Sequence, residues 1–559
     1  MLYTVTQMSS TTHTARKEQR NPDHKDGREV EWQLASTDLG AVRRWLAEHG
    51  TIDGLVVEPR STLNIFDTYL DTHDWRIHRA GFALRIRSES GKSEATLKSL
   101  HSASTEVADR RELSESLENS ESESIRQSIG PVGSRVHAVS GTRALLPLFE
   151  VRTSRQRFAI RREDEAKQLG EIALDETVIS RPDGEPKTSM QRVEVEALTE
   201  AHEPLQSLVK TLRSDCALEA ASDTKYSQGL KSVGLAPGPA TEFAPTAIDA
   251  SMPVVEVALA NLRRYLSAWH HHEPGARLGD DPEELHDLRV AGRRLDGILR
   301  QFRAYLPAPF LRLRPVLKET LRALGEARDL DVALSELETF SRELAQADRQ
   351  SVEPLRQHLV SERRRARARM LSVLDSGPVQ DRFQDLTSLL RASSAASQRS
   401  SSQSALRAAP ELIRVRYRKL RKSADLLTPD SSIEAYHEVR SRVKKLRYAL
   451  EAVAAIYGKP SDQMLRTLRR WQDKLGVQQD SAVASRRLKA LASAPPEGIA
   501  PETLFLMGRL SEHYASTAVR ARKLYARHYR KVRGRWKRLR MKFEDPVLGD
   551  APKLPDSGP

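Results

Sequence analysis

Cysteine, aromatic residues and long apolar runs are all scarce in this 559-residue chain. The lone cysteine, Cys216, excludes an intramolecular disulfide. The chain has no run of about eighteen apolar residues that could span a bilayer, so we expect no membrane partner. Residues 1–27 mix polar and charged types without the apolar core of a signal peptide, which predicts a disordered tail and a cytoplasmic protein.

Both halves of the chain contain basic and acidic side chains, but the balance between the two signs differs from one half to the other. Residues 1–250 hold 32 basic and 39 acidic side chains, whereas residues 251–559 hold 58 basic and 37 acidic ones. The second half therefore carries a net charge of +21 against −7 for the first, within a total of +14. Such an excess of cations indicates a polyanionic partner for the second half.

Two kinds of periodicity divide the chain. Up to residue 232, short alternating segments broken by Gly, Asp and Ser predict strands, with one helix at about residues 37–48. The Gly-, Pro- and Ala-rich residues 233–253 predict a linker, and stretches of period near 3.6 then predict helices. We therefore predict an α+β protein with a strand-rich domain at 28–232, an all-α domain at 254–545 and a disordered tail at 546–559.

An internal repeat runs through the helical half at a constant offset of 151 residues. It comprises His286, Arg289, Arg293, Arg294 and Leu295, which match His437, Arg440, Lys444, Lys445 and Leu446, and then Leu324, Gly325, Asp329 and Val332, which match Leu475, Gly476, Asp480 and Val483. Two blocks at one offset predict a duplicated helical bundle with pseudo-twofold symmetry. We expect the two repeated aspartates to cap helices or to pair with arginines, and not to bind metal.

The strands of the first half each carry one charged face. Alternation places polar, mostly charged side chains opposite apolar ones in six segments. The pairs are Glu29 and Glu31, Arg85 and Arg87, Thr96 and Lys98, Arg155 and Arg157, Glu171 and Asp175, and Glu194 and Glu196. An ordinary sheet with one solvated face is the simplest interpretation. Carboxylates gather on the first and last strands and cations on the middle ones, however, which favours inward faces that grip phosphate and a divalent metal.

Residues 28–232 resemble the CYTH family of triphosphate tunnel metalloenzymes in their motifs and in the order of these motifs along the chain. Its Glu-x-Glu-x-Lys signature appears here as Glu29, Glu31 and Gln33. The remaining matches are Tyr69, Leu70, Asp71, Thr72, Gly81, Leu84, Arg85, Arg87, Thr96, Leu97, Lys98, Arg110, Glu112, Arg155, Arg157, Asp175, Glu194, Glu196, Lys225 and Tyr226. The signature lysine is replaced by Gln33, a neutral amide that donates a hydrogen bond but carries no charge.

The resemblance implies a tunnel of eight antiparallel strands that binds and hydrolyses a triphosphate with Mg²⁺ or Mn²⁺. The implied metal ligands are Glu29, Glu31, Glu112, Asp175, Glu194 and Glu196, with Glu29 and Glu31 as the catalytic pair. The implied substrate-binding residues are Arg85, Arg87, Lys98, Arg155 and Arg157. Inorganic triphosphate, a nucleoside triphosphate and thiamine triphosphate remain open as substrates.

Each repeat of the helical half predicts a cationic stripe. His286, Arg289, Arg293 and Arg300 lie on one helix face. His437, Arg440 and Lys444 lie on the equivalent face of the second repeat, flanked by Lys445 and Arg447. A solvated helix face is the alternative interpretation of either stripe alone. Further basic segments at 363–369, 414–422 and 530–542 also fit a nucleic-acid-binding surface. Because the cationic stripe is duplicated, we favour nucleic-acid binding less than a symmetric groove for another polyanion.

These blocks and their position after the strand-rich domain resemble the CHAD domain, over residues 254–545. The resemblance implies binding of inorganic polyphosphate by His286, Arg289, Arg293, Arg294, His437, Arg440, Lys444 and Lys445. We therefore predict a metal-dependent triphosphatase fused to a polyphosphate-binding domain, cytoplasmic and able to associate with polyphosphate granules. A scaffolding protein with a tunnel that binds but does not cleave is the main alternative.

Overall fold

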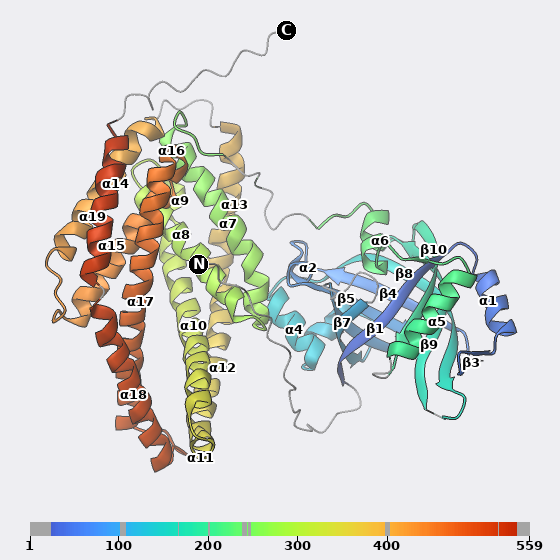
Figure 1. Cartoon of the computed structure of the whole chain (residues 1–559). Coiled ribbons are helices and arrows are strands. Elements are labelled where there is room, and N and C mark those ends of the chain that lie inside the picture. The colour runs from blue at the N-terminus through green and yellow to red at the C-terminus, as the bar shows by residue number, and fades with distance from the viewer. Residues whose placement is uncertain are drawn as a thin grey trace, which may run out of the picture. The chain divides into compact units, whose positions relative to one another are not determined.

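The computed structural model describes residues 24–100, 108–165, 167–198, 202–237, 243, 247–396, 403–523 and 525–544. The chain forms two compact units that divide between residues 237 and 238 (Figure 1). The division falls inside the predicted linker. The first unit is built around one sheet and the second is helical, so the predicted α+β class is confirmed.

The first unit contains eleven strands and six helices among its described residues. The strands are β1 (His24–Ser36), β2 (Thr51–Ile52), β3 (Leu55–Pro59), β4 (Leu63–Asp71), β5 (Phe82–Glu89), β6 (Lys92–Ser99), β7 (Ala108–Leu117), β8 (Leu146–Arg162), β9 (Gln168–Ser180), β10 (Pro186–Ala197) and β11 (Glu219–Ala220). The helices are α1 (Leu39–Glu48), α2 (Arg76–Arg79), α3 (Ser122–Gln127), α4 (Pro131–Ser140), α5 (His202–Asp215) and α6 (Lys225–Ser232).

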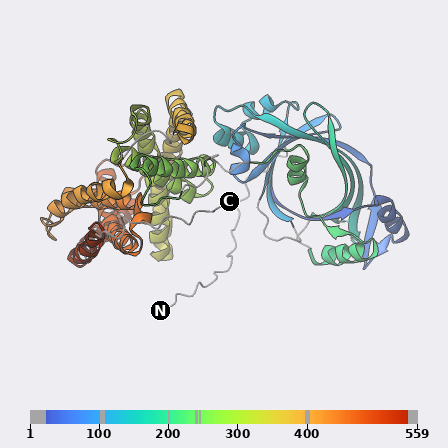
Figure 2. The same cartoon turned by 90° about the horizontal axis from the view of Figure 1, so that it is seen from above.

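Eight of these strands close into a ring, as Figure 2 shows from above. The ring runs β8-β4-β5-β6-β7-β1-β10-β9 and returns to β8, and every pairing in it is antiparallel. The predicted eight-stranded tunnel is thus confirmed, but the sheet as a whole has three more short strands. They arise because the staggered long strands β8 and β1 extend beyond the ring, where β3 and β11 pair with them.

The first strand also begins earlier than expected. His24 to Glu31 pair with β7, so residues 24–27 belong to the sheet and not to a disordered tail. Their side chains, like those of residues 108–110, lie outside the part of the chain that the structure describes.

The ring turns its apolar faces outward and its charged faces inward. Trp32 and Leu34 alternate with the charged positions of β1 and are buried in a core beneath α1 and α5. These two helices supply Val42, Trp45 and Leu208 to the same core, which also holds apolar side chains of β9 and β10. Because the apolar face is covered from outside, the alternating polar face must line the interior of the ring.

Helix α6 closes one end of the ring, where Figure 2 shows it inside the ring's outline. Its Tyr226 and Leu230 are buried against Tyr69 and Phe149 in a small apolar cluster. Tyr226 also accepts or donates a hydrogen bond at 3.1 Å to the ring of His78, which ties α6 to α2. The helix therefore acts as a plug.

The second unit is all-helical. Its described helices are α7 (Val254–Leu278), α8 (Pro282–Gln301), α9 (Ala308–Leu311), α10 (Leu313–Glu343), α11 (Gln346–Arg349), η1 (Gln350–Val352), α12 (Glu353–Asp375), α13 (Gly377–Ala396), α14 (Ala405–Ala424), α15 (Ile433–Glu451), α16 (Ala454–Tyr457), α17 (Lys459–Ser493), α18 (Pro501–Arg522) and α19 (Tyr525–Lys542). Helices α7 and α8 begin 151 residues before α14 and α15, which confirms the duplication.

A pseudo-twofold axis is visible in the backbone where the two halves begin. Pro253 and its equivalent Ser404 form an isolated antiparallel bridge. The amide of Val254 donates to Gln403 at 3.0 Å, and the equivalent amide of Ala405 donates to Met252 at 2.8 Å. Each bond is the counterpart of the other at the offset of 151, and one continuous apolar core joins the halves.

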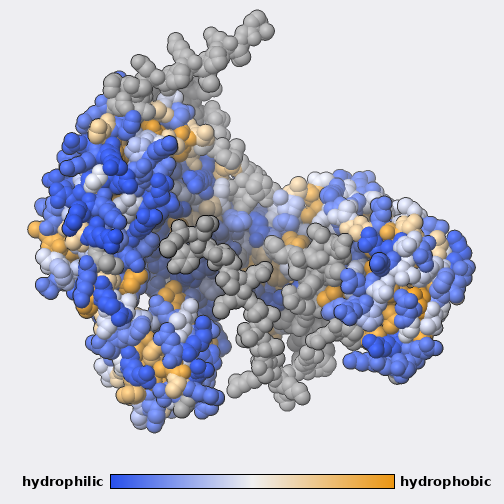
Figure 3. Space-filling model, in the orientation of Figure 1, coloured by the Kyte–Doolittle hydropathy of each residue, from blue (hydrophilic) through white to orange (hydrophobic). Residues whose placement is uncertain are grey.

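Hydrophilic residues dominate the visible faces of both units, with hydrophobic ones in small scattered groups (Figure 3). Among the described residues, no helix combines the length and the apolar character that crossing a bilayer requires.

Replacing Gly229 with alanine should displace α6 from the end of the ring. A Cβ at Gly229 would lie 2.2 Å from Cε2 of Phe149, so either the ring or α6 must shift. We expect a loss of about 1–3 kcal/mol in the stability of the first unit. Calorimetry of the full chain measures this, with Gly50→Ala as the control because a Cβ there meets no atom within 4 Å. Equal melting of the two variants would contradict the assigned packing.

Candidate phosphate-binding sites

A cavity of about 260 Å³ occupies the interior of the ring, and all eight ring strands contribute to its wall. Most of its charged side chains belong to the set predicted from the sequence: Glu31, Arg85, Arg87, Lys98, Glu112, Arg155, Glu194 and Glu196. Glu94, Glu171 and Lys225 complete the charged lining. The acidic strands and the basic strands therefore line one shared cavity, which we call the tunnel cavity.

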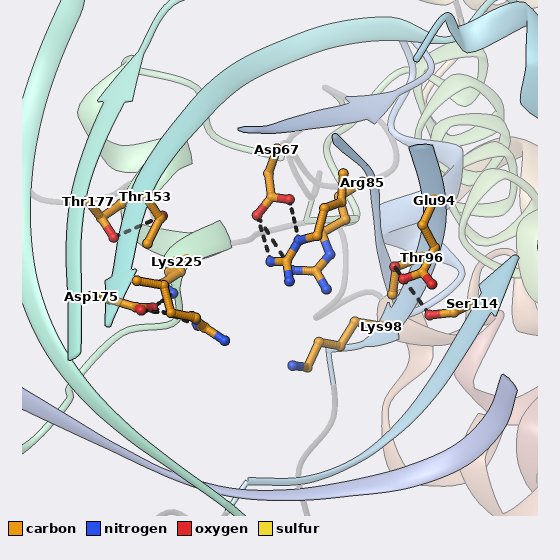
Figure 4. Close-up of polar contacts among 12 residues, drawn as sticks. Asp67, Arg85, Glu94, Thr96, Lys98, Ser114, Thr153, Asp175, Thr177 and Lys225 are labelled. Carbon is orange, nitrogen blue, oxygen red and sulfur yellow. Dashed lines mark hydrogen bonds and ion pairs between the residues drawn. The ribbon is translucent and has the colours of Figure 1, made fainter. Parts of the chain in front are cut away.

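Asp67 on β4 fixes two of the predicted cations. Its carboxylate accepts hydrogen bonds from Nε of Arg87 at 2.8 Å and from Nη2 at 2.9 Å, and it lies 3.6 Å from Nη1 of Arg85 (Figure 4). Burial by itself would raise the pKa of Asp67, but the charges of Arg85 and Arg87 outweigh it and lower the pKa to about 2. Asp67 is thus ionised and holds both guanidinium groups in place.

On the opposite wall, Asp175 and Glu194 share two cations. Arg155 binds Asp175 through two parallel hydrogen bonds of 2.8 and 2.7 Å, and its Nη2 also reaches Glu194 at 2.5 Å. Lys225, at the start of the plug helix, donates to Asp175 and lies 3.0 Å from Glu194. Burial opposes ionisation of Glu194, yet Lys225 and Arg155 hold its pKa well below the usual range.

Gln33 lines the cavity and bridges two charged groups. Its amide nitrogen donates to Glu31 at 2.7 Å, and its amide oxygen accepts from the buried Arg192 at 3.3 Å. Glu31 also lies 3.3 Å from the ammonium group of Lys98. Positive charge is therefore supplied close to Gln33 by neighbouring side chains.

Some predicted residues lie apart from the tunnel cavity. Asp175 is fully buried behind it and is engaged with Arg155 and Lys225. Arg157 is absent from the lining; it donates to Ser61 at 3.3 Å and lies 3.7 Å from Glu171. The side chain of Glu29 lies outside the described residues, as does that of Arg110.

Sequence reasoning missed Asp67 and committed no role to Lys225. Asp67 lies on the same face of β4 as Ile65 and Tyr69, which are two residues away on either side. The alternation of side chains along β4 could therefore have indicated that Asp67 belongs to this face. Its partners lie on β5, and only the pairing of Asp67 with Arg87 across the two strands reveals the ion pair. Lys225 belongs to helix α6, so the alternation of side chains along a strand could not predict that it lines the tunnel cavity.

The donor set of the tunnel cavity suits a hard divalent cation. Within the described part of the chain, no three Asp, Glu, His or Cys side chains are grouped closely enough to form a complete cage. Mg²⁺, however, usually keeps several waters and takes one or two protein carboxylates together with phosphate oxygens of the substrate. The lining carboxylates Glu31, Glu112, Glu194 and Glu196 fit that mode of binding.

In the helical unit, the two repeats bring four cations together. Arg289 donates to the carbonyl of Gly325 and to Asp329, both at 3.1 Å. Arg440, its equivalent, binds Asp480 at 3.1 and 3.3 Å. The repeated aspartates therefore pair with arginines, as expected. We call Arg289, Arg293, Arg440 and Lys444 the central cationic cluster.

Lys444 is the most strongly affected member of this cluster. Burial lowers its pKa, and the charges of Arg293, Arg440 and Arg289 lower it further, to about 7. The same like-charge repulsion and burial lower the pKa of Arg293. The protein thus holds cations close together at a cost, which is the arrangement expected of a site prepared for a polyanion. The predicted histidines, His286 and His437, are exposed on the same helices.

Arg294 and Lys445 do not join the central cationic cluster. Arg294 lies 3.7 Å from Glu451 and stacks over the ring of Tyr265, with its guanidinium carbon 5.4 Å from the ring centre. Lys445 lines a separate pocket between α8, α14 and α15. The two positions are equivalent in sequence but differ in surroundings.

Comparison with known proteins agrees with this architecture. Family models match the CYTH domain over residues 42–228 and the CHAD domain over residues 260–489. The fold and its charged interior define a triphosphate-tunnel domain joined to a duplicated helical bundle. The chain is a CYTH domain followed by a CHAD domain. A comparison with curated proteins finds no match.

Solved structures match one unit or the other. The CHAD domain from the plant Ricinus communis is 25% identical, with a TM-score of 0.43, and the match covers 50% of this chain and 94% of that one. PptA from Streptomyces chartreusis is 19% identical, with a TM-score of 0.40, over 50% and 100% of the two chains. A putative adenylyl cyclase from Hippeastrum, described as having a dominant triphosphatase activity, is 15% identical, with a TM-score of 0.26, over 37% and 97%.

Substituting Asp67 with asparagine should destabilise the first unit in a pH-dependent way. The lowered pKa means that Asp67 contributes stability above pH 3.8 and loses it as the pH falls toward 2. The shift corresponds to about 2 kcal/mol at pH 7. Melting of Asp67→Asn and wild type should therefore differ most at neutral pH and converge in acid.

The exposed Asp164 offers a matched control, because Asp164→Asn makes the same charge change away from the ring interior. If Asp67→Asn melted like this control at pH 7, the assigned role of Asp67 would be wrong.

Proposed function

We propose that the tunnel cavity hydrolyses inorganic triphosphate or a related triphosphate chain, and that the helical unit binds inorganic polyphosphate. The observation that carries the first part is the convergence of carboxylates and cationic groups from seven of the eight ring strands on one cavity. Phosphoryl transfer needs cations on the phosphate oxygens and ligands for a divalent metal within the same small volume.

The charge of the wall supports a requirement for metal. Five cations and six glutamates line the cavity among the described residues. Behind this lining, Asp67 and Asp175 are offset by Arg157 and Arg192. The interior therefore carries a small excess of negative charge before any ligand enters. A triphosphate anion alone meets a wall of its own sign, whereas one accompanied by divalent cations does not.

Glu31, Glu112, Glu194 and Glu196 would hold the metal, which when bound neutralises phosphate charge and makes water a better nucleophile. The protein's own contribution is positioning. Asp67 keeps Arg85 and Arg87 oriented toward the cavity, so both can grip phosphate oxygens without further rearrangement. The plug helix closes one end, which limits the access of bulk water.

In the helical unit, the carrying observation is the central cationic cluster. Arg293 and Lys444 are surrounded by other cations, and burial weakens their hydration. A chain of phosphates would bring about one negative charge per unit to these groups and relieve their repulsion. Such binding releases counterions and so weakens as salt concentration rises.

A scaffolding function without hydrolysis is the second candidate, and Gln33 favours it. Its amide is engaged with Glu31 and Arg192 and carries no charge toward the cavity. In this function the tunnel would retain a phosphate chain without cleaving it.

Phosphate release separates the two candidates. We expect purified full-length protein to release phosphate from inorganic triphosphate, ATP or long-chain polyphosphate with Mg²⁺ or Mn²⁺, and the ranking of the three identifies the substrate. Glu31→Gln/Glu112→Gln should lower the rate about a hundredfold or more, because two interior carboxylates are removed without a change of size.

Glu163→Gln is the matched control, since Glu163 is exposed and lies outside the cavity. Turnover that survives in Glu31→Gln/Glu112→Gln would place the reaction elsewhere. No turnover with any metal, together with retained polyphosphate binding, would establish the scaffold.

Polyphosphate affinity should depend on pH through Lys444. Bound polyphosphate favours its protonated form, so affinity is full below pH 7 and declines by up to about tenfold per pH unit above it. Lys444→Arg should retain binding and lose this dependence between pH 7.5 and 9, because arginine stays protonated there. Dissociation constants at fixed ionic strength measure the effect, and equal pH slopes for variant and wild type would contradict it.

A further inference from the structure

The face of α15 that carries Lys445 opens into a pocket of about 610 Å³, which lies apart from the central cationic cluster. Helices α8, α14 and α15 form its wall. Six cations line it: Arg300, Arg416, Lys419, Lys422, Arg442 and Lys445. We call it the lysine 445 pocket.

The pseudo-twofold symmetry provides an internal comparison for this pocket. Lys445 is equivalent to Arg294, and Arg300 is equivalent to Glu451. Arg294 of the first half faces Glu451 of the second half at 3.7 Å and forms an ion pair. At the symmetric position, Lys445 of the second half faces Arg300 of the first half, which is a like charge. The cation is therefore neutralised at one of the two symmetric positions and not at the other.

Three of the other lining cations have uncharged counterparts in the first half. Arg416, Lys419 and Arg442 are equivalent to Tyr265, Ala268 and Ala291, whereas Lys422 is equivalent to His271. A general need for surface charge would have affected both halves alike. The accumulation of cations around one member of a symmetric pair indicates a ligand at that member alone.

Few carboxylates balance the lysine 445 pocket. Arg442 pairs with Glu438, and Arg300 lies 3.1 Å from Asp296. For Lys419, Lys422 and Lys445, the described part of the chain provides no ion-pair partner. Burial lowers the pKa of Lys445, and the neighbouring charge of Arg300 lowers it further. An anion in the pocket would relieve this repulsion.

The lining also distinguishes between classes of polyanion. Tyr448 is the one aromatic residue of the described lining, and its ring is buried, with the guanidinium carbon of Arg447 4.8 Å from its centre. Binding of single-stranded nucleic acid relies on exposed aromatic faces on which bases stack. The pocket instead presents ammonium and guanidinium groups, which suit phosphate oxygens.

We propose that the lysine 445 pocket is a second oligophosphate-binding site of the helical unit, separate from the central cationic cluster and without a counterpart at the symmetric position. The choice of ligand rests on the proposed function of this unit. A long phosphate chain would engage both sites, whereas a short one would occupy either.

Protection of individual lysines tests the proposal in the full-length protein. The protein is treated with an amine-reactive reagent, with and without inorganic tripolyphosphate, and each lysine is followed by mass spectrometry. We expect Lys419 and Lys445 to be protected at least about fivefold, even in an Arg289→Ala/Arg440→Ala variant that weakens the central cationic cluster.

Protection of Lys444 in wild type but not of Lys419 and Lys445 would overturn this proposal alone. Protection of none of the three would overturn the proposed polyphosphate binding as well.

Neutral variants give an independent measurement. Lys419→Gln/Lys445→Gln should weaken long-chain polyphosphate binding about tenfold and reduce the slope of log affinity against log salt by about one to two. Lys489→Gln/Lys537→Gln is the matched control, because it removes two exposed lysines outside both sites. Equal affinity and slope for the two double variants would contradict a second site. Loss of RNA binding without loss of polyphosphate binding would assign the pocket to nucleic acid instead.

Discussion

Charges enclosed by a ring of strands need opposite charges close by, because solvent reaches them poorly, and the first unit is organised around this constraint. Asp67 and Asp175 contribute little to the open wall, yet they set the positions of Arg85, Arg87 and Arg155. The same constraint sends the apolar residues of β1, β9 and β10 outward, where α1 and α5 cover them. The covering helices, the plug and the charged interior thus follow from one distribution of polar and apolar faces.

The helical unit handles charge in the opposite way. Its core is apolar and continuous across both halves. The fully buried Arg277 has internal partners in Glu273 and Asp375, whereas the central cationic cluster lacks such an internal balance among the described residues. Repulsion between Lys444 and its neighbours is tolerated because the packed helices fix the backbone. The stability of this unit comes from its core, and the energy of its cationic surfaces remains available for a ligand.

The sequence predicted those features that depend on short-range periodicity or on exact spacing. Alternation identified Arg85, Arg87 and Glu194 as residues of one polar face, and the offset of 151 predicted the symmetry of the helical unit. It could not reveal which residues face one another across paired strands, such as Asp175 and Arg155, because this depends on the register of the pairing. It grouped Arg294 with Lys445 because their neighbours along the helix are similar, whereas the difference between them arises from residues 300 and 451 on the opposing helix.

The reciprocal bridge between Pro253 and Ser404 has a consequence for how the two halves could diverge. Its hydrogen bonds join main-chain atoms only, so they persist whatever side chains replace those around them. A duplicated segment held in this way keeps its symmetric backbone while individual positions drift apart. The exchange of a glutamate for an arginine between residues 451 and 300 is such a drift, and it turned two copies of one structure into two surfaces of different chemistry.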